Sequence, residues 1–147
     1  MLKISAPQLN QIKQHVASTY PNEGGGLLIG HAEADGSKQV IEVRVIENQS
    51  TLEEQYHRIL VTDQMYRDGE AYADSRGLDL IGFLHSHPDH PARPSEFDRE
   101  HALPWWSYLI ISVQYGQPTD VFSWQLRDDR SAFDAEEIVI EEIVVEP

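Results

Sequence analysis

The chain has 147 residues, the usual size of one globular domain, and its 40% hydrophobic content is enough for a packed core. The 25 Asp and Glu residues outnumber the 11 Lys and Arg residues, and the net charge of −14 disfavours nucleic-acid binding, which needs a basic surface. The sequence contains no cysteine, which excludes disulfides, cysteine nucleophiles and thiolate metal sites.

No apolar run is long enough to span a membrane, and the first residues lack a secretory signal. We therefore expect a cytoplasmic protein without a membrane partner. The acidity indicates either attraction of a basic partner or adjustment to high salt. No linker, repeat or low-complexity tract interrupts the chain, so we expect a single domain over residues 1–147.

The first half of the chain predicts a helix and a hairpin. Residues 7–19 carry apolar side chains at helical spacing, and Ser5 can cap the start of this helix. Glu23 and three glycines then lead into an apolar strand around residues 27–29. A turn at Asp35-Gly36 connects this strand to the alternating segment 40–46. Residues 54–60 are compatible with another short strand.

The second half predicts two helices and four strands. A helix begins at Thr62-Asp63 and ends near Arg76, and the apolar residues 78–84 favour a central strand. Residues 85–94 contain too much proline for a helix or a central strand. A short helix from Ser95 to about residue 102 follows, and then strands at 108–113, 121–126 and 138–145. The fold class is therefore α/β of the mixed α+β kind: a mixed sheet with two main helices and a short third one.

Two histidines at the end of the apolar strand are candidate metal ligands. His85 and His87 are two residues apart, so a strand presents both imidazoles on one face, about 7 Å apart at the backbone. Pro88 restricts His87 to an extended conformation. His-x-His alone is a weak signal that occurs in many proteins by chance.

A third ligand is needed, and Asp98 is the first candidate. It falls at the third position of the short helix, where Ser95-x-x-Asp98 also fits a capping box with Asp in place of Glu. His90 and His101 are rival ligands. Without cysteine, two histidines and a carboxylate would leave one position of a tetrahedral zinc ion for water, as in hydrolytic zinc sites.

A hydrolytic site also needs a base outside the metal shell. Glu23 is a candidate because the glycines that follow it permit close backbone approach, although a solvated glutamate at a strand mouth fits the sequence equally well.

Together these residues form an ordered pattern that begins with Glu23-x-Gly25-Gly26-x-Leu28-x-Gly30. It continues with His85-Ser86-His87-Pro88, a gap of six residues, and Ser95-x-x-Asp98. This pattern resembles the motif of the JAMM (MPN+, Mov34) metalloproteases. The likeness covers nearly the whole chain and is weakest over residues 33–60 and the last few.

The resemblance implies that zinc is bound by His85, His87 and Asp98. It also implies that Glu23 activates water and that Ser95 helps to stabilise the oxyanion. The implied fold is a curved sheet flanked by helices and related to that of deaminases. The implied reaction cleaves a peptide or isopeptide bond after the C-terminal glycine of a ubiquitin-like protein. Small bacterial members are associated with sulfur-carrier proteins, whose short Gly-Gly tail would bind here as an added strand.

Other classes fit less well. The chain is too short for an amidohydrolase barrel, it lacks the cysteine ligands of zinc deaminases, and Ser86 has no nucleophile elbow. The main alternative is a non-catalytic MPN-type protein-binding module, which has no use for Glu23 beside an open metal position. Iron or cobalt is also compatible with this ligand set.

Overall fold

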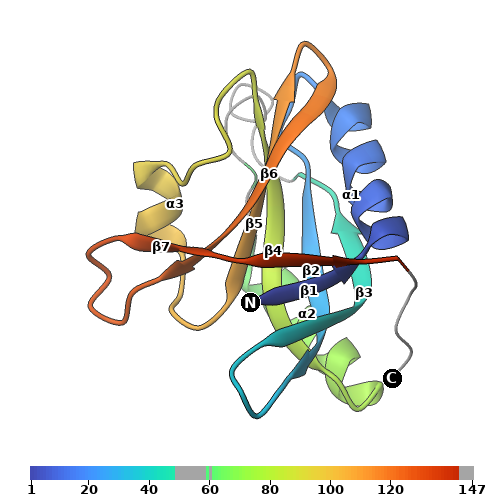
Figure 1. Ribbon diagram of the computed structural model, residues 1–147, viewed down its shortest axis with the longest axis vertical. Coiled ribbons are helices and arrows are strands. Elements are labelled where there is room, and N and C mark those ends of the chain that lie inside the picture. The colour runs from blue at the N-terminus through green and yellow to red at the C-terminus, as the bar shows by residue number, and fades with distance from the viewer. Residues whose placement is uncertain (49–58, 60, 143–147) are drawn as a thin grey trace.

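A mixed β-sheet organises the protein. The structure is a computed structural model that describes residues 1–48, 59 and 61–142, and within these an eight-stranded sheet has the order β7-β6-β5-β4-β2-β3-β1-β8 (Figure 1). Its strands are β1 (Leu2–Ser5), β2 (Gly25–Ala32), β3 (Lys38–Ile46), β4 (Asp79–Pro88), β5 (Ser107–Gln114), β6 (Gln117–Leu126), β7 (Phe133–Glu136) and β8 (Ile138–Glu141). The helices are α1 (Ala6–Thr19), α2 (Asp63–Ser75) and α3 (Glu96–His101), and none of these described helices is both long and apolar enough to cross a bilayer.

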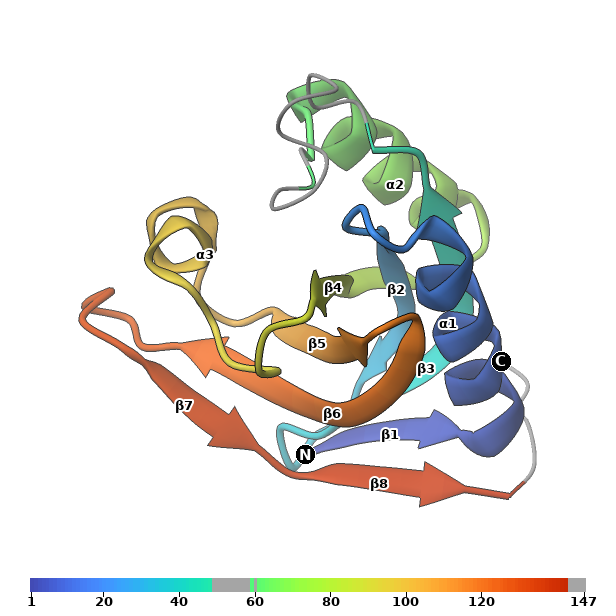
Figure 2. The same ribbon diagram turned by 90° about the horizontal axis from the view of Figure 1, so that it is seen from above.

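The sheet curves so strongly that its two edge strands are consecutive in the chain. Strands β7 and β8 lie at opposite ends of the strand order, yet only Glu137 separates them in the chain. The N–H of Leu2 donates to the carbonyl of Glu137 at 2.8 Å, and β1 then pairs in parallel with β8. The sheet is therefore nearly barrel-shaped (Figure 2). This confirms the expected curved mixed sheet flanked by helices.

The helices cover different faces of this sheet. Helix α1 packs its apolar side chains Leu9, Ile12 and Val16 against the inner face, in the larger core cluster. Helix α2 contributes Ala73 to a second cluster on the outer face, where it meets side chains of β2 and β4. Helices α2 and α3 lie on the same side of β4 and β5, and the candidate site lies on that side (Figure 2).

Most predicted elements are confirmed, and the differences concern short strands and strand ends. The short strands β1 and β7 were not predicted, because four residues carry little pattern of their own and only pairing with distant strands defines them. Strand β4 extends beyond the predicted residues 78–84 as far as Pro88, and it includes the two histidines that were expected at the strand end. The possible strand at residues 54–60 lies outside the described residues except for Ile59, and so do residues 143–145 of the last predicted strand.

The extension of β4 has a simple physical reason. The ladder with β2 stops where Gly25 faces His85, whereas the parallel ladder with β5 continues to the pair Pro88 and Val113. Beyond His85 the strand therefore has a partner strand on one side only. Proline lacks an N–H and is tolerated at the end of such a strand.

A buried lysine joins distant parts of the sheet. The side chain of Lys38 at the start of β3 is 0% exposed. Its ammonium group donates to the carbonyl oxygen of Trp105 and, at 3.1 Å, to the hydroxyl of Ser107 at the start of β5. Burial lowers the pKa of Lys38. No local pattern of residues indicates this role, because it depends on partners 67 and 69 positions away in the chain.

The start of α1 provides a test of the fold. The Ser5 hydroxyl accepts from the N–H of Gln8, whose side chain accepts from the N–H of Ser5, so the expected cap is a full capping box. Replacing Ser5→Ala should lower the free energy of unfolding by about 1 kcal/mol, because one buried backbone donor loses its acceptor. Chemical denaturation measures this change. The exposed Ser18→Ala should change it by less than roughly 0.5 kcal/mol, and equal effects would contradict the assignment.

Candidate metal centre

The end of β4 places both histidines on the outer face of the sheet. Opposite Leu28 and Ile29 of β2 stand Gly82 and Leu80, so Ile81 is an extra residue on β4, a bulge. After this bulge, Phe83, His85 and His87 share the outer face, because side chains alternate along a strand. Both imidazoles are buried, with exposed fractions of 7% and 8%.

The three expected metal ligands converge. The Nε2 atoms of His85 and His87 are 3.1 Å apart, and each lies 3.2 Å from one carboxylate oxygen of Asp98. Ligand atoms of a tetrahedral zinc ion, each about 2.0–2.2 Å from the metal, are roughly 3.3–3.6 Å from one another. The spacing and the donor set of two imidazoles and a carboxylate therefore fit a divalent metal such as zinc.

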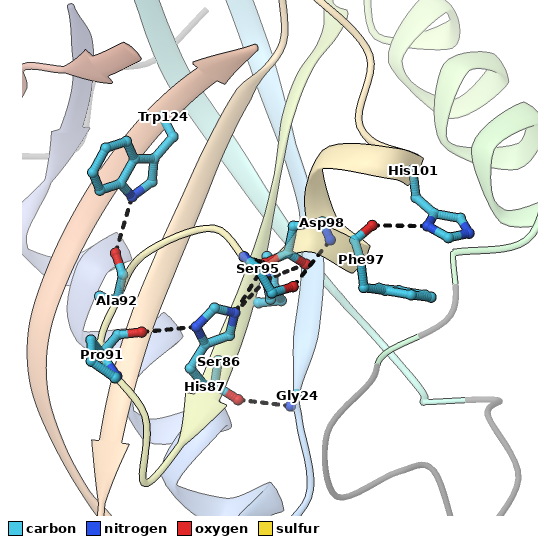
Figure 3. Close-up of polar contacts among 11 residues, drawn as sticks. Gly24, Ser86, His87, Pro91, Ala92, Ser95, Phe97, Asp98, His101 and Trp124 are labelled. Atoms are coloured by element: carbon cyan, nitrogen blue, oxygen red, sulfur yellow. Dashed lines mark hydrogen bonds and ion pairs between the residues drawn. The ribbon is translucent and has the colours of Figure 1, made fainter. Parts of the chain in front are cut away.

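A backbone carbonyl fixes the tautomer of His87. Its Nδ1 lies 2.9 Å from the carbonyl oxygen of Pro91, and because a carbonyl only accepts, Nδ1 carries the hydrogen (Figure 3). When the imidazole is neutral, the lone pair of Nε2 is then directed at the site, as for most metal-bound histidines. The loop that supplies Pro91 is itself held, since the indole N–H of Trp124 donates to the carbonyl of Ala92 at 3.0 Å.

The position of Asp98 fits both of the roles that the sequence left open, helix capping and metal binding. The Ser95 hydroxyl accepts from the N–H of Asp98 at 3.1 Å, and the N–H of Ser95 donates to the Asp98 carboxylate at 2.8 Å, which forms a capping box. The same carboxylate faces both imidazoles. The cap thus orients the candidate ligand. The Ser95 hydroxyl uses its oxygen in this cap and keeps its hydrogen for a further acceptor.

Hydrogen bonds to the neighbouring residue Gly24 hold the Glu23 segment beside the site. Ser86, between the two histidines, donates its N–H to the Gly24 carbonyl at 3.0 Å, and its hydroxyl accepts from the Gly24 N–H at 2.9 Å (Figure 3). Asn48 donates to the Glu23 carbonyl at 3.0 Å. A Cβ atom on Gly25 would lie 2.7 Å from the Ile59 side chain and 2.9 Å from the Leu84 carbonyl oxygen. This close approach explains why glycine occupies this position, one of the three that follow Glu23.

Burial and charge shift the ionisation of this group of side chains. Burial raises the pKa of Glu23 above its usual range, and the charges of the two imidazoles oppose this rise. Burial would lower the pKa of His85, but the charge and hydrogen bond of Asp98, together with the charge of Glu23, outweigh burial and raise that pKa to about 9. Burial would raise the pKa of Asp98, yet the charge of His85 and hydrogen bonds to both imidazoles hold it well below its usual range.

The structure separates the rival residues from the candidates. His101 stacks on Phe97 with ring centroids 4.0 Å apart and has its Nδ1 2.8 Å from the Phe97 carbonyl (Figure 3). His90 is exposed. Neither belongs to the group that can hold a metal ion among the described residues. The role of Ser86 as the anchor of the Glu23 segment was not predicted, and the only available signal was a polar residue between two candidate ligands.

Comparisons with known proteins agree with this fold. Residues 5–127 match the family described as prokaryotic homologs of the JAB domain, and the chain belongs to this family. A solution structure of a Salinibacter ruber protein is 39% identical, with a TM-score of 0.73, and the match covers 99% of this chain and 94% of that one. A search of curated proteins gives no significant match.

Two further structures show the same architecture. A Desulfitobacterium hafniense protein is 28% identical with a TM-score of 0.83, and the match covers 98% of this chain and 95% of that one. A JAB1/MPN domain protein from Archaeoglobus fulgidus is 21% identical with a TM-score of 0.57, over 95% of this chain and 99% of that one. The JAMM/MPN resemblance of the sequence is thereby confirmed at the level of family and fold.

Substitutions can separate the helix-capping role of Asp98 from its expected role as a metal ligand. In Asp98→Asn the side chain still accepts from the Ser95 N–H but loses its charge, so zinc affinity should fall more than about 10-fold. Ser95→Ala removes the cap and keeps the carboxylate, so it should weaken zinc binding less and the helix more. Zinc titration by calorimetry and denaturation of the metal-free variants measure both effects. A larger loss of zinc affinity in Ser95→Ala would contradict the assignment.

Zinc binding should release a proton. The metal-free site keeps His85 protonated below a pKa of about 9, whereas a metal ligand must be neutral. Lowering the pH therefore favours protonation of His85 over metal binding. Between about pH 6 and pH 8 the apparent affinity should rise by up to about tenfold per pH unit. Calorimetry in two buffers of different ionisation enthalpy counts the protons, and a count of zero would contradict the prediction.

Proposed function

We propose that this protein is a zinc-dependent hydrolase of the JAMM type. It cleaves a peptide or isopeptide bond after the C-terminal glycine of a ubiquitin-like or sulfur-carrier protein. The observation that carries the proposal is the buried carboxylate of Glu23, which lines the same cleft as His85 and Asp98 of the converging ligand group. A purely structural metal site needs no such carboxylate.

Different residues would carry out metal binding and proton transfer in this hydrolysis. His85, His87 and Asp98 would hold the ion, which supplies Lewis acidity and makes water nucleophilic near neutral pH. Glu23 accepts the proton of the attacking water and gives it to the leaving amine. Burial raises the pKa of Glu23, so this carboxylate is a stronger base than an exposed one.

Ser95 would stabilise the negative charge that develops on the oxygen of the scissile carbonyl. Its hydroxyl hydrogen is not used by the helix cap, where the oxygen accepts from the Asp98 N–H. It can therefore donate to the oxyanion that forms when water adds to the scissile carbonyl. The substrate class is supported by the resemblance of the whole motif to JAMM metalloproteases.

The substitution Glu23→Gln tests the proposal. It removes the base but keeps the size of the side chain, so metal content should remain that of the wild type. Cleavage of a Gly-Gly-tailed carrier fusion should fall by about 10²- to 10⁴-fold. Metal analysis and a cleavage assay on the same preparations measure both quantities. The exposed Glu137→Gln is the matched control and should keep full activity.

Other outcomes of this experiment would show which part of the proposed function is wrong. Bound metal without cleavage of any carrier tail would overturn the hydrolase and favour the non-catalytic binding module. Equal activity in the wild type and Glu23→Gln would remove Glu23 from the mechanism. Absence of bound metal after loading in chelator-free buffer would overturn the metal centre itself.

A further inference from the structure

An apolar cleft of about 500 Å³ opens beside the candidate metal centre. Its lining residues come mainly from the start of α2, from α3 and from β4 and β5. Figure 2 shows that α2 and α3 lie on the same side of these two strands. We call it the aromatic cleft, because five aromatic side chains line it: Tyr66, Phe83, Phe97, Tyr108 and Phe133. This volume lies within the usual range of small-ligand pockets.

The aromatic side chains form a continuous preformed surface. Phe83 and Tyr108, from neighbouring strands, stack with centroids 5.5 Å apart and planes at 20°. Tyr66 of α2 extends this surface at 6.4 Å from Phe83, and Phe133 of β7 meets Tyr108 edge-on at 6.0 Å. These rings are fixed by one another, so an apolar guest meets a surface that needs little reordering.

The described charges around the cleft disfavour an anionic guest. The described lining residues include no lysine or arginine, whereas Glu23, Asp63 and Asp98 are carboxylates. Among the described lining residues, an anionic side chain would meet these carboxylates and no lysine or arginine. A neutral apolar side chain, aromatic or large and branched, is the chemistry that this surface accepts.

The cleft borders the candidate base and two of the three candidate ligands. Its lining includes Glu23, His85 and Asp98, whereas Ser95 and His87 are not among the described lining residues. Under the proposed mechanism Ser95 faces the oxyanion, and Glu23 hands its proton to the leaving amine. The part of the substrate that departs with the amine therefore lies nearest to the cleft.

We propose that the aromatic cleft binds an aromatic or large branched apolar side chain on the leaving-amine side of the scissile bond. This inference rests on the proposed hydrolase function and names a specificity that the function alone does not contain. The substrate then carries such a residue directly after the glycine that is cleaved.

Paired substrates test this specificity. Carrier fusions or peptides that end in Gly-Gly-Phe-amide and Gly-Gly-Ser-amide differ only at the leaving residue. The wild type should cleave the Phe substrate with a kcat/KM roughly 10- to 100-fold higher than the Ser substrate, because only the former fills the cleft. Equal values for the two substrates would overturn the inference and leave the proposed hydrolase intact.

Substitutions locate the preference in the cleft. Phe97→Ala opens one wall and should reduce the preference several-fold, and Val61→Trp, at a lining position that is 38% exposed, should fill the cleft and reduce it as well. Phe122→Ala removes an aromatic side chain that is 50% exposed outside the cleft and should leave the preference unchanged. A preference that survives both cleft variants, with thermal unfolding showing that they are folded, would overturn the assignment.

A binding measurement separates this inference from the hydrolase. The zinc-loaded Glu23→Gln variant, which should not turn over, is titrated with Phe-amide and with Ser-amide by NMR. Shifts of cleft resonances with Phe-amide alone, lost when Val61→Trp is added, would support the cleft even if no carrier is cleaved. Equal binding of the two amides would overturn the cleft assignment even if the carriers are cleaved.

Discussion

Strand β4 keeps its parallel partner β5 as far as Pro88, while its ladder with β2 ends opposite His85. This pairing holds the last residues of the strand extended, so the two imidazoles share the outer face and Ser86 between them turns to the other side. Ser86 then bonds both backbone groups of Gly24. A slip of one residue would direct both imidazoles into the apolar interior. One strand end therefore positions the candidate ligands and the segment of the candidate base together.

The buried charged groups at the end of β4 lower the stability of the fold unless a cation compensates them. His85, Asp98 and Glu23 are withdrawn from water next to a largely aromatic surface, and buried charges are unfavourable unless they are paired. In the metal-free protein the His85–Asp98 pair supplies part of this compensation. A metal ion that binds only the folded chain would add its binding free energy to stability. Occupancy of the site and stability of the fold are therefore linked.

The fold alone does not define the chemistry. Relatives at 28% and 39% identity share the curved sheet, and a nearly barrel-shaped sheet of this kind can support binding as well as catalysis. The difference depends on individual side chains, above all on a buried carboxylate beside an open set of ligands. On this chain the polar ligands and the aromatic cleft lie side by side, so reaction and recognition would share one face of β4 and β5.

The sequence by itself determined the features that arise from neighbouring residues. Caps such as Ser5 with Gln8, and the shared face of His85 and His87, follow from spacings of two or three residues. The order and spacing of the motif also predicted the family and the fold class. Only the tertiary structure decided the short strands β1 and β7, the closure of the sheet and the aromatic cleft. It also decided that Ser86 anchors a glycine 62 positions away. These features depend on contacts between segments far apart in the chain, and no local pattern of residues encodes which distant partner each segment meets.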